Sequence, residues 1–197
     1  MLIHSLLPRS AVNGPGERAV VWLQGCGLHC PGCWNKSTHR FDRDRARPPE
    51  EVGEWILSCP EVEGVTFSGG EPMQQADSLL RLIRCLRQQA PELSFGMFSG
   101  YAEHELDQGQ YWIWGYASSE QHRKYLWQEI RACLDFAILG RFYRAQPSSL
   151  PLRTSRNQVL RLFTNRYSPA DFSEQLTEVS IHKDGQVEVT GFPLGWP

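Results

Sequence analysis

The chain has 197 residues, of which 41% are hydrophobic and 21% are charged. This composition is typical of a globular protein, and it excludes a disordered, collagen-like or coiled-coil chain. The formal net charge is −2, so no overall basic excess indicates nucleic acid or an anionic membrane as a partner. No apolar run approaches the ~20 residues that span a bilayer, and residues 1–7 lack the features of a signal peptide.

Strands and helices alternate along most of the chain. In chain order, the apolar patterns predict strands over 1–7 and 19–24, a helix over 50–57, a strand over 64–68, a helix over about 75–89, and strands over 94–99, 135–139 and 157–163. Ser118 and Gln121 resemble a capping box that opens a further helix, ending near Cys133. Two alternating runs, 177–182 and 186–190, flank Asp184-Gly185 and predict a β-hairpin.

The order of these elements indicates an α/β fold with a mostly parallel sheet and right-handed crossovers. In such folds, ligands sit at the carboxyl ends of the strands. Four loops follow predicted strands, over residues 25–35, 69–72, 100–101 and 140–142. We therefore expect these loops to meet at one edge of the sheet.

Three of the six cysteines are crowded into one loop, as Cys26-x3-Cys30-x2-Cys33. Thiolates are soft ligands for iron–sulfur clusters or for zinc, and three of them on a four-iron cube leave one iron open to a substrate. Structural zinc is the alternative, with His29 or His39 as a further ligand. The remaining cysteines, Cys59, Cys85 and Cys133, are isolated, and we interpret each as a small buried hydrophobe. This distribution favours a metal site in a reducing cytoplasm over a secreted disulfide framework.

A second motif, Gly69-Gly70-Glu71-Pro72, follows a predicted strand. Paired glycines let the main chain approach a ligand closely, and Glu71 offers a carboxylate beside them. Taken alone, the motif is also compatible with a plain strand-to-helix turn.

The motifs together resemble those of a known family. The matching residues are Asn13-Gly14-Pro15-Gly16-x-Arg18, Gly25-Cys26-x3-Cys30-Pro31-Gly32-Cys33, Asn35-Lys36-Ser37-Thr38, Ser68-Gly69-Gly70-Glu71-Pro72, Gly100-Tyr101 and Asn157-Gln158-Val159. This combination resembles the radical S-adenosylmethionine superfamily. It is most similar to the small activases of glycyl radical enzymes, in particular those of anaerobic ribonucleoside-triphosphate reductase.

The resemblance implies a partial (β/α)6 barrel in which Cys26, Cys30 and Cys33 hold a [4Fe–4S] cluster. The open iron would chelate S-adenosylmethionine, and one electron would cleave it to methionine and a 5′-deoxyadenosyl radical. In activases, that radical takes a hydrogen atom from a backbone glycine of a partner enzyme. Cofactor contacts are implied at Gly32, Trp34, Ser68, Gly69, Gly70, Glu71, Pro72, Gly140, Arg141 and Phe142. Trp22 and Phe67 are candidates for apolar walls or for core packing.

The resemblance also implies partners and a domain division. We expect residues 1–165 to form the radical S-adenosylmethionine core and residues 166–197 to form an extension with the hairpin, within one domain. The expected partners are a glycyl radical enzyme, such as anaerobic ribonucleoside-triphosphate reductase, and a flavodoxin or ferredoxin as electron donor. Four arginines between residues 40 and 47 are a hypothetical docking site for that acidic donor. We expect a cytoplasmic protein that binds neither nucleic acid nor membrane.

One position departs from the family pattern. Leu139 stands where activases commonly carry an aspartate, just before the glycine at Gly140. A leucine side chain has no acceptor for hydrogen bonds from a ribose. Arg141 follows and is able to pair with a carboxylate. Two other functions are kept as alternatives. One is a radical S-adenosylmethionine enzyme that acts on a small molecule or peptide, as carboxy-deazaguanine synthases do. The other is a zinc-stabilised binding module without catalysis.

Overall fold

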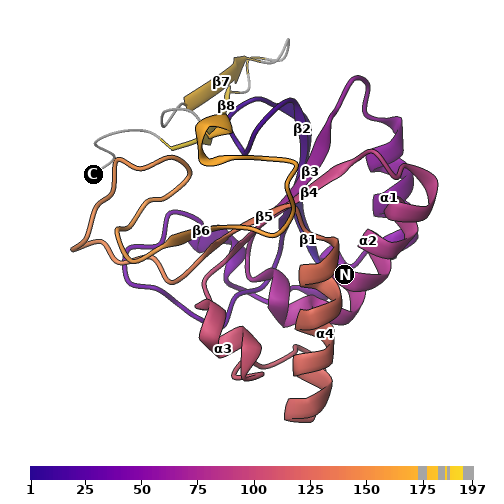
Figure 1. Cartoon of the computed structure of the whole chain (residues 1–197), viewed down its shortest axis with the longest axis vertical. Helices are drawn as coiled ribbons and strands as arrows, with labels where there is room; N and C mark the ends of the chain where they lie inside the picture. Colours follow the sequence, from indigo (N-terminus) through magenta and orange to yellow (C-terminus); the bar gives the residue numbers. More distant parts are fainter. Residues whose placement is uncertain (173–176, 182–184, 186, 193–197) are drawn as a thin grey trace.

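The computed structural model describes residues 1–172, 177–181, 185 and 187–192. A six-stranded sheet runs through its centre, with the strands in sequence order (Figure 1). The strands are β1 (Ile3–Ser10), β2 (Arg18–Leu23), β3 (Gly64–Gly69), β4 (Ser94–Ser99), β5 (Phe136–Leu139) and β6 (Val159–Leu162). The helices are α1 (Pro49–Ser58), α2 (Ala76–Gln89), α3 (Glu103–Asp107) and α4 (Glu120–Cys133), and short 3-10 turns occupy Lys36–Thr38, Arg43–Arg45, Pro72–Gln75 and Pro169–Asp171.

The predicted mostly parallel sheet is confirmed, except at its two edges. Strands β2 to β5 are parallel, whereas β1 pairs antiparallel with β2 and β6 pairs antiparallel with β5. A parallel return needs a crossover of a dozen or more residues, and only residues 11–17 separate β1 from β2. Residues 140–158 join β5 to β6 without a helix, so this connection also reverses the chain direction.

The two faces of the sheet bury different sets of residues, because successive side chains of a strand point to opposite faces. In β5, Ala137 and Leu139 belong to the larger core, together with the apolar face of α2. Phe136 and Ile138, on the opposite face, pack instead with Leu152 and Phe172 from the C-terminal third of the chain. Helices therefore cover one face of the sheet, and the later segments of the chain cover the other.

A buried arginine joins three strands at their amino ends. Arg18 is fully buried at the start of β2 and donates hydrogen bonds to Thr66 Oγ1 (2.8 Å), Ser94 Oγ (2.7 Å) and the Val65 carbonyl (2.9 Å). Its guanidinium also lies 5.1 Å from the centre of the Phe136 ring. Arg18 thereby fixes the edge of the sheet that lies opposite the carboxyl ends of the parallel strands.

The structure differs from the sequence predictions at three local points. The N-cap of α4 is Ser119, whose side chain accepts from the His122 amide, so the predicted capping role of Ser118 is wrong. Helix α3 was not predicted, since its five residues are too few to show a periodic pattern. Cys59, Cys85 and Cys133 are partly exposed rather than fully buried.

The C-terminal strands form a separate pair. Strand β7 (Thr177–Ile181) pairs antiparallel with β8 (Val187–Gly191) and does not join the six-stranded sheet. Most of the predicted turn, residues 182–184 and 186, lies outside the described residues, so the hairpin turn stays a prediction. Among the residues that the structure describes, no helix is long and apolar enough to cross a membrane.

Candidate cofactor site

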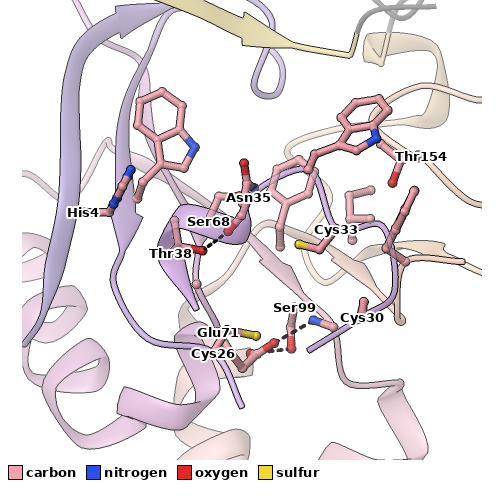
Figure 2. A pocket seen from close by; sticks show the side chains of 18 of the residues that line it. His4, Cys26, Cys30, Cys33, Asn35, Thr38, Ser68, Glu71, Ser99 and Thr154 are labelled. Atoms are coloured by element: carbon pink, nitrogen blue, oxygen red, sulfur yellow. Dashed lines mark hydrogen bonds between the residues drawn. The ribbon is translucent and has the colours of Figure 1, made fainter. Parts of the chain in front are cut away.

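A cavity of about 440 Å³ opens at the carboxyl ends of the parallel strands (Figure 2). Each of the four expected loops lines it: the cysteine loop after β2, the Gly69–Glu71 loop after β3, Gly100 after β4, and Gly140 with Phe142 after β5. The prediction that these loops meet at one edge is therefore confirmed. The volume lies within the range of ~300–1,000 Å³ that is usual for small-molecule sites.

Backbone hydrogen bonds fix the cysteine loop. The Gly25 amide donates to the Thr38 carbonyl (2.6 Å), the Cys26 amide donates to the His39 carbonyl (3.0 Å), and the Cys33 amide donates to the Cys30 carbonyl (3.0 Å). A side chain at Gly25 would meet the Phe41 ring at 2.3 Å, and its φ of +105° favours glycine. The loop is thus held in shape by the chain itself.

An aromatic loop supports the cysteine loop from outside. Residues 108–117 form a loop that places Trp112 and Trp114 against Phe41, with their ring centres 5.3 and 5.5 Å from that of Phe41. Trp112 also fills the space where a Cβ of Gly27 would lie, at 2.4 Å. The aromatic residues of this loop are therefore part of the packing around the cysteines.

The three thiols line the cavity and are half-buried. Burial raises the pKa of Cys26 to about 12, and it also raises the pKa of Cys33. Within the described residues, no three His, Cys, Asp or Glu side chains are close enough together to hold one metal ion. A four-iron cube takes one thiolate on each of three irons, so its ligands stand further apart than those of a single ion. Three cysteines on one loop, at the wall of an open cavity, fit such a cube.

Paired glycines bring the loop after β3 against the cysteine loop. The Gly70 amide donates to the Leu23 carbonyl (2.7 Å), and the Glu71 amide donates to the Gly25 carbonyl (2.9 Å). A Cβ on Gly70 would lie 2.3 Å from the Gly25 carbonyl oxygen. The second glycine is therefore required by the close approach of two protein backbones.

The Glu71 side chain is turned into the protein. Its carboxylate accepts hydrogen bonds from the Met73 amide (3.0 Å), Ser99 Oγ (2.8 Å) and the Gly100 amide (2.7 Å). Burial raises the pKa of Glu71 to about 7, although these hydrogen bonds oppose the rise. Glu71 thus ties the end of β3 to the end of β4 at the floor of the cavity (Figure 2).

The structure separates the expected cofactor residues into two groups. Those that line the cavity are Cys26, Cys30, Cys33, Trp34, Ser68, Gly69, Gly70, Glu71, Gly140 and Phe142. Gly32, Pro72 and Arg141 are not among the lining residues. Arg141 instead pairs with Glu105 and lies 5.3 Å from the centre of the Tyr101 ring. A cofactor contact at these three positions stays a prediction.

Trp22 and Phe67 were candidates for apolar walls of the site or for core packing. Trp22 lines the cavity. Phe67 is fully buried on the helix-covered face, so core packing accounts for it.

Several lining residues were not singled out from the sequence. They come from β1, from the ends of β4 and β5, and from the C-terminal segments: His4, Ser5, Phe98, Ile138, Leu152, Thr154, Val189, Thr190 and Phe192. Asn13, Asn35, Ser37, Thr38 and Gln158 also line it. These five residues belong to the motifs on which the family resemblance rests, so the sequence could have identified them as site residues.

Comparisons with known proteins agree with this geometry. The family model described as "4Fe-4S single cluster domain" matches residues 12–161. The anaerobic ribonucleoside-triphosphate reductase-activating protein of Vibrio cholerae is 28% identical over 171 residues, which cover 83% of this chain and 99% of that protein. The protein of the same name from Escherichia coli K12 is 31% identical over 56% of this chain and 75% of its own length. The pyruvate formate-lyase-activating enzyme of Clostridium pasteurianum is 34% identical over 52% of this chain and 46% of that enzyme.

The family match decides between the two metals that the cysteine spacing left open. It assigns the loop to an iron–sulfur cluster rather than to structural zinc. The chain belongs to the 4Fe–4S single-cluster family, among the radical S-adenosylmethionine enzymes of the glycyl-radical activase type.

Proposed function

We propose that this protein cleaves S-adenosylmethionine reductively and installs a glycyl radical on a partner enzyme, such as an anaerobic ribonucleotide reductase. The observation that carries the proposal is the meeting of three thiols and three further strand-end loops around one cavity. The names of the relatives supply the class of partner.

Different residues of the chain would bind the cluster and S-adenosylmethionine. Cys26, Cys30 and Cys33 would hold the cluster, with one thiolate on each of three irons. When bound, the reduced cluster supplies one electron that cleaves a carbon–sulfur bond of the sulfonium, giving methionine and a 5′-deoxyadenosyl radical. The remaining residues position the nucleoside and keep water out of the cavity.

Backbone and aromatic groups at the cavity wall suit the polar and the flat parts of S-adenosylmethionine. Ser68, Gly69 and Gly70 offer polar main-chain and hydroxyl groups beside the cysteine loop. Trp34 and Phe142 lie near each other, with ring centres 6.1 Å apart, and supply apolar walls. Glu71 and Gly140 line the same cavity. Gly32, Pro72 and Arg141 do not line it, and a contact between them and the cofactor stays part of the proposal.

The architecture is proposed to be a partial (β/α)6 barrel. The strands follow one another in sequence order, and helices cover only one face. We also propose that residues 1–165 form the core and that residues 166–197 belong to the same domain. Phe172 supports the assignment of both parts to one domain, because it packs with Phe136 and Ile138 of β5.

The external electron is proposed to come from a flavodoxin or ferredoxin that docks near the cysteine loop. Arg45 hydrogen-bonds to the His4 carbonyl (2.9 Å), and Arg47 pairs with Glu51 (3.3 Å). Arg40 is exposed, and Arg43 is exposed over the Trp114 ring, at 5.6 Å from its centre. These two guanidinium groups are the better candidates for contact with an acidic donor.

Charge reversal tests this docking site. Arg40→Glu with Arg43→Glu is expected to slow cluster reduction by flavodoxin at least tenfold at low salt, and to leave reduction by dithionite unchanged. Arg166→Glu is the matched control, since Arg166 is exposed and bonds to the Glu92 carbonyl near the start of β4. If flavodoxin reduces the cluster at the same rate in the double variant and in the control, Arg40 and Arg43 are not part of the docking site.

The main experiment is anaerobic reconstitution with iron and sulfide, followed by reduction with dithionite in the presence of S-adenosylmethionine. The wild-type chain is expected to form 5′-deoxyadenosine. Cys26→Ala, Cys30→Ala and Cys33→Ala are each expected to abolish it. Cys85→Ala is the matched control, because Cys85 lies on α2 and does not line the cavity. Nucleoside cleavage that persists in any of the three loop variants contradicts the proposal.

The partner is tested separately, by adding purified anaerobic ribonucleotide reductase to the reduced protein. A glycyl radical signal in the electron paramagnetic resonance spectrum is the expected result. Formation of 5′-deoxyadenosine without any such signal would keep the cofactor chemistry and reject this partner.

A further inference from the structure

The C-terminal strand pair reaches the cavity although it lies beyond the residues that match the family model. That match ends at residue 161, whereas β8 spans Val187–Gly191. Val189, Thr190, Gly191 and Phe192 all line the cavity. A segment that the family comparison does not cover therefore contributes to the wall of the site.

A buried hydrogen bond attaches β8 to the core. Asn13 Nδ2 donates to Thr190 Oγ1 (2.9 Å) and to Ser10 Oγ (2.8 Å). Asn13 is 5% exposed and Thr190 is 9% exposed, so both are shielded from solvent. Because a buried amide that loses a partner is costly, this contact defines where β8 sits relative to the loop after β1.

An aromatic contact attaches the end of the segment. The Phe192 ring stacks on Phe98, with ring centres 5.8 Å apart and an angle of 24° between the planes. Phe98 is near the end of β4 and lines the cavity too. Phe192 also packs against the smaller core cluster on the face of the sheet without helices.

Other side chains of the same strand pair face solvent. Val187 is 60% exposed and Ile181, its partner across the pair, is 76% exposed. Thr190 and Phe192 line the cavity, whereas Val187 and Ile181 do not. This difference supplies matched control positions within one element.

We propose that β8 is a wall of the S-adenosylmethionine cavity and that Thr190 and Phe192 are positioning residues for that cofactor. The inference rests on the proposed function. Thr190, fixed by Asn13, and Phe192, fixed by Phe98, close the side of the cavity that faces away from the helices. They hold the bound nucleoside in place and reduce its exposure to water.

The proposal predicts a binding defect that is separate from folding. Phe192→Ala removes the ring from the wall, and we expect the Kd for S-adenosylmethionine to rise at least fivefold. Thr190→Val keeps the shape of the side chain but removes the hydroxyl that Asn13 contacts, and we expect a rise of two- to fivefold. Val187→Thr, on the solvent side of the same strand, is expected to leave the Kd unchanged.

Binding is measured by equilibrium dialysis of labelled S-adenosylmethionine against the full-length, cluster-loaded protein without reductant, so that no turnover occurs. Iron content and melting temperature are recorded for every variant. If Phe192→Ala fails to fold, Phe192→Leu and Thr190→Val carry the test. A second readout is the amount of 5′-deoxyadenosine formed per glycyl radical, which we expect to rise when the wall is opened.

The outcomes separate the inference from the function on which it rests. If folded Phe192→Leu or Phe192→Ala, together with Thr190→Val, binds S-adenosylmethionine as tightly as wild type, β8 is not a wall of the site. If the wild-type protein itself fails to bind S-adenosylmethionine once loaded with its cluster, the proposed function fails. Weaker binding in the wall variants alone, with wild-type iron content and stability, supports the inference.

Discussion

Replacing Gly70 by alanine tests whether close backbone packing assembles the site. The new Cβ would lie 2.3 Å from the Gly25 carbonyl oxygen and 3.0 Å from the Leu23 carbonyl oxygen. Both obstacles are main-chain atoms of the β2 strand and the cysteine loop, so no side-chain rotation relieves them. The loop after β3 must move away, and the hydrogen bond from the Glu71 amide to the Gly25 carbonyl (2.9 Å) must lengthen.

The expected cost follows from these two contacts. Overpacking in a tight region costs about 1–3 kcal/mol, and the lost hydrogen bond adds about 1 kcal/mol. A central value of about 3 kcal/mol lowers the melting temperature of a domain of this size by about 6–12 °C. The shift also separates the cysteine loop from the loop after β3, so we expect binding of S-adenosylmethionine to fall in the variant that remains folded.

Gly53→Ala is the matched control, because it makes the same chemical change within α1. A Cβ there would meet only the Leu82 Cδ1 atom, at 3.4 Å. Alanine favours a helix over glycine by about 1 kcal/mol, so this variant is expected to melt higher than wild type. Thermal unfolding of the cluster-free chain, followed by circular dichroism, measures both. A Gly70→Ala protein that melts within 2 °C of wild type would refute the packing argument.

Two further predictions concern charged groups away from the thiols. Arg18→Met is expected to lower the free energy of unfolding by about 3 kcal/mol in urea titrations, because it leaves buried hydroxyl and carbonyl groups without their shared donor; an unchanged midpoint would contradict this. Although burial alone would raise it, the pKa of Glu105 lies below its usual value because Arg141 and the Ala102 amide donate to the carboxylate. The stability from Glu105 is therefore present above the ordinary pKa of a glutamate and is lost as the pH falls through the lowered value. We expect wild type to lose more of its melting temperature between pH 5 and pH 3 than Glu105→Gln does, and parallel losses would contradict the assignment.

Local sequence patterns predicted most of the elements, and the cysteine spacing predicted the centre of the site. Strand and helix positions followed from apolar periodicity, which depends on neighbours along the chain. The parallel order then placed four loops at one edge without any side-chain information. The Ser118 prediction failed by one residue because two adjacent serines carry the same capping chemistry, and only the helix phase selects Ser119.

What the sequence could not predict depends on contacts between distant segments. Arg141 was one of the expected cofactor contacts, yet its guanidinium pairs with Glu105 on α3, and no local pattern couples the two residues. In the same way, the hydrogen bond between Asn13 and Thr190 spans most of the chain. Alternation identified β8 as a strand, but nothing in its sequence showed which other segment it would contact.

The alternation along β5 gives the two faces of one short strand different neighbours. Ala137 and Leu139 face the helices, whereas Phe136 and Ile138 face the side of the sheet that carries the cavity. Substitutions at Ala137 or Leu139 would therefore change packing against the helices without replacing a residue that lines the cavity. A search for variants with higher thermal stability would begin at Ala137 and Leu139, and a search for variants with a new substrate would begin at Ile138, on the other face of the same four-residue strand.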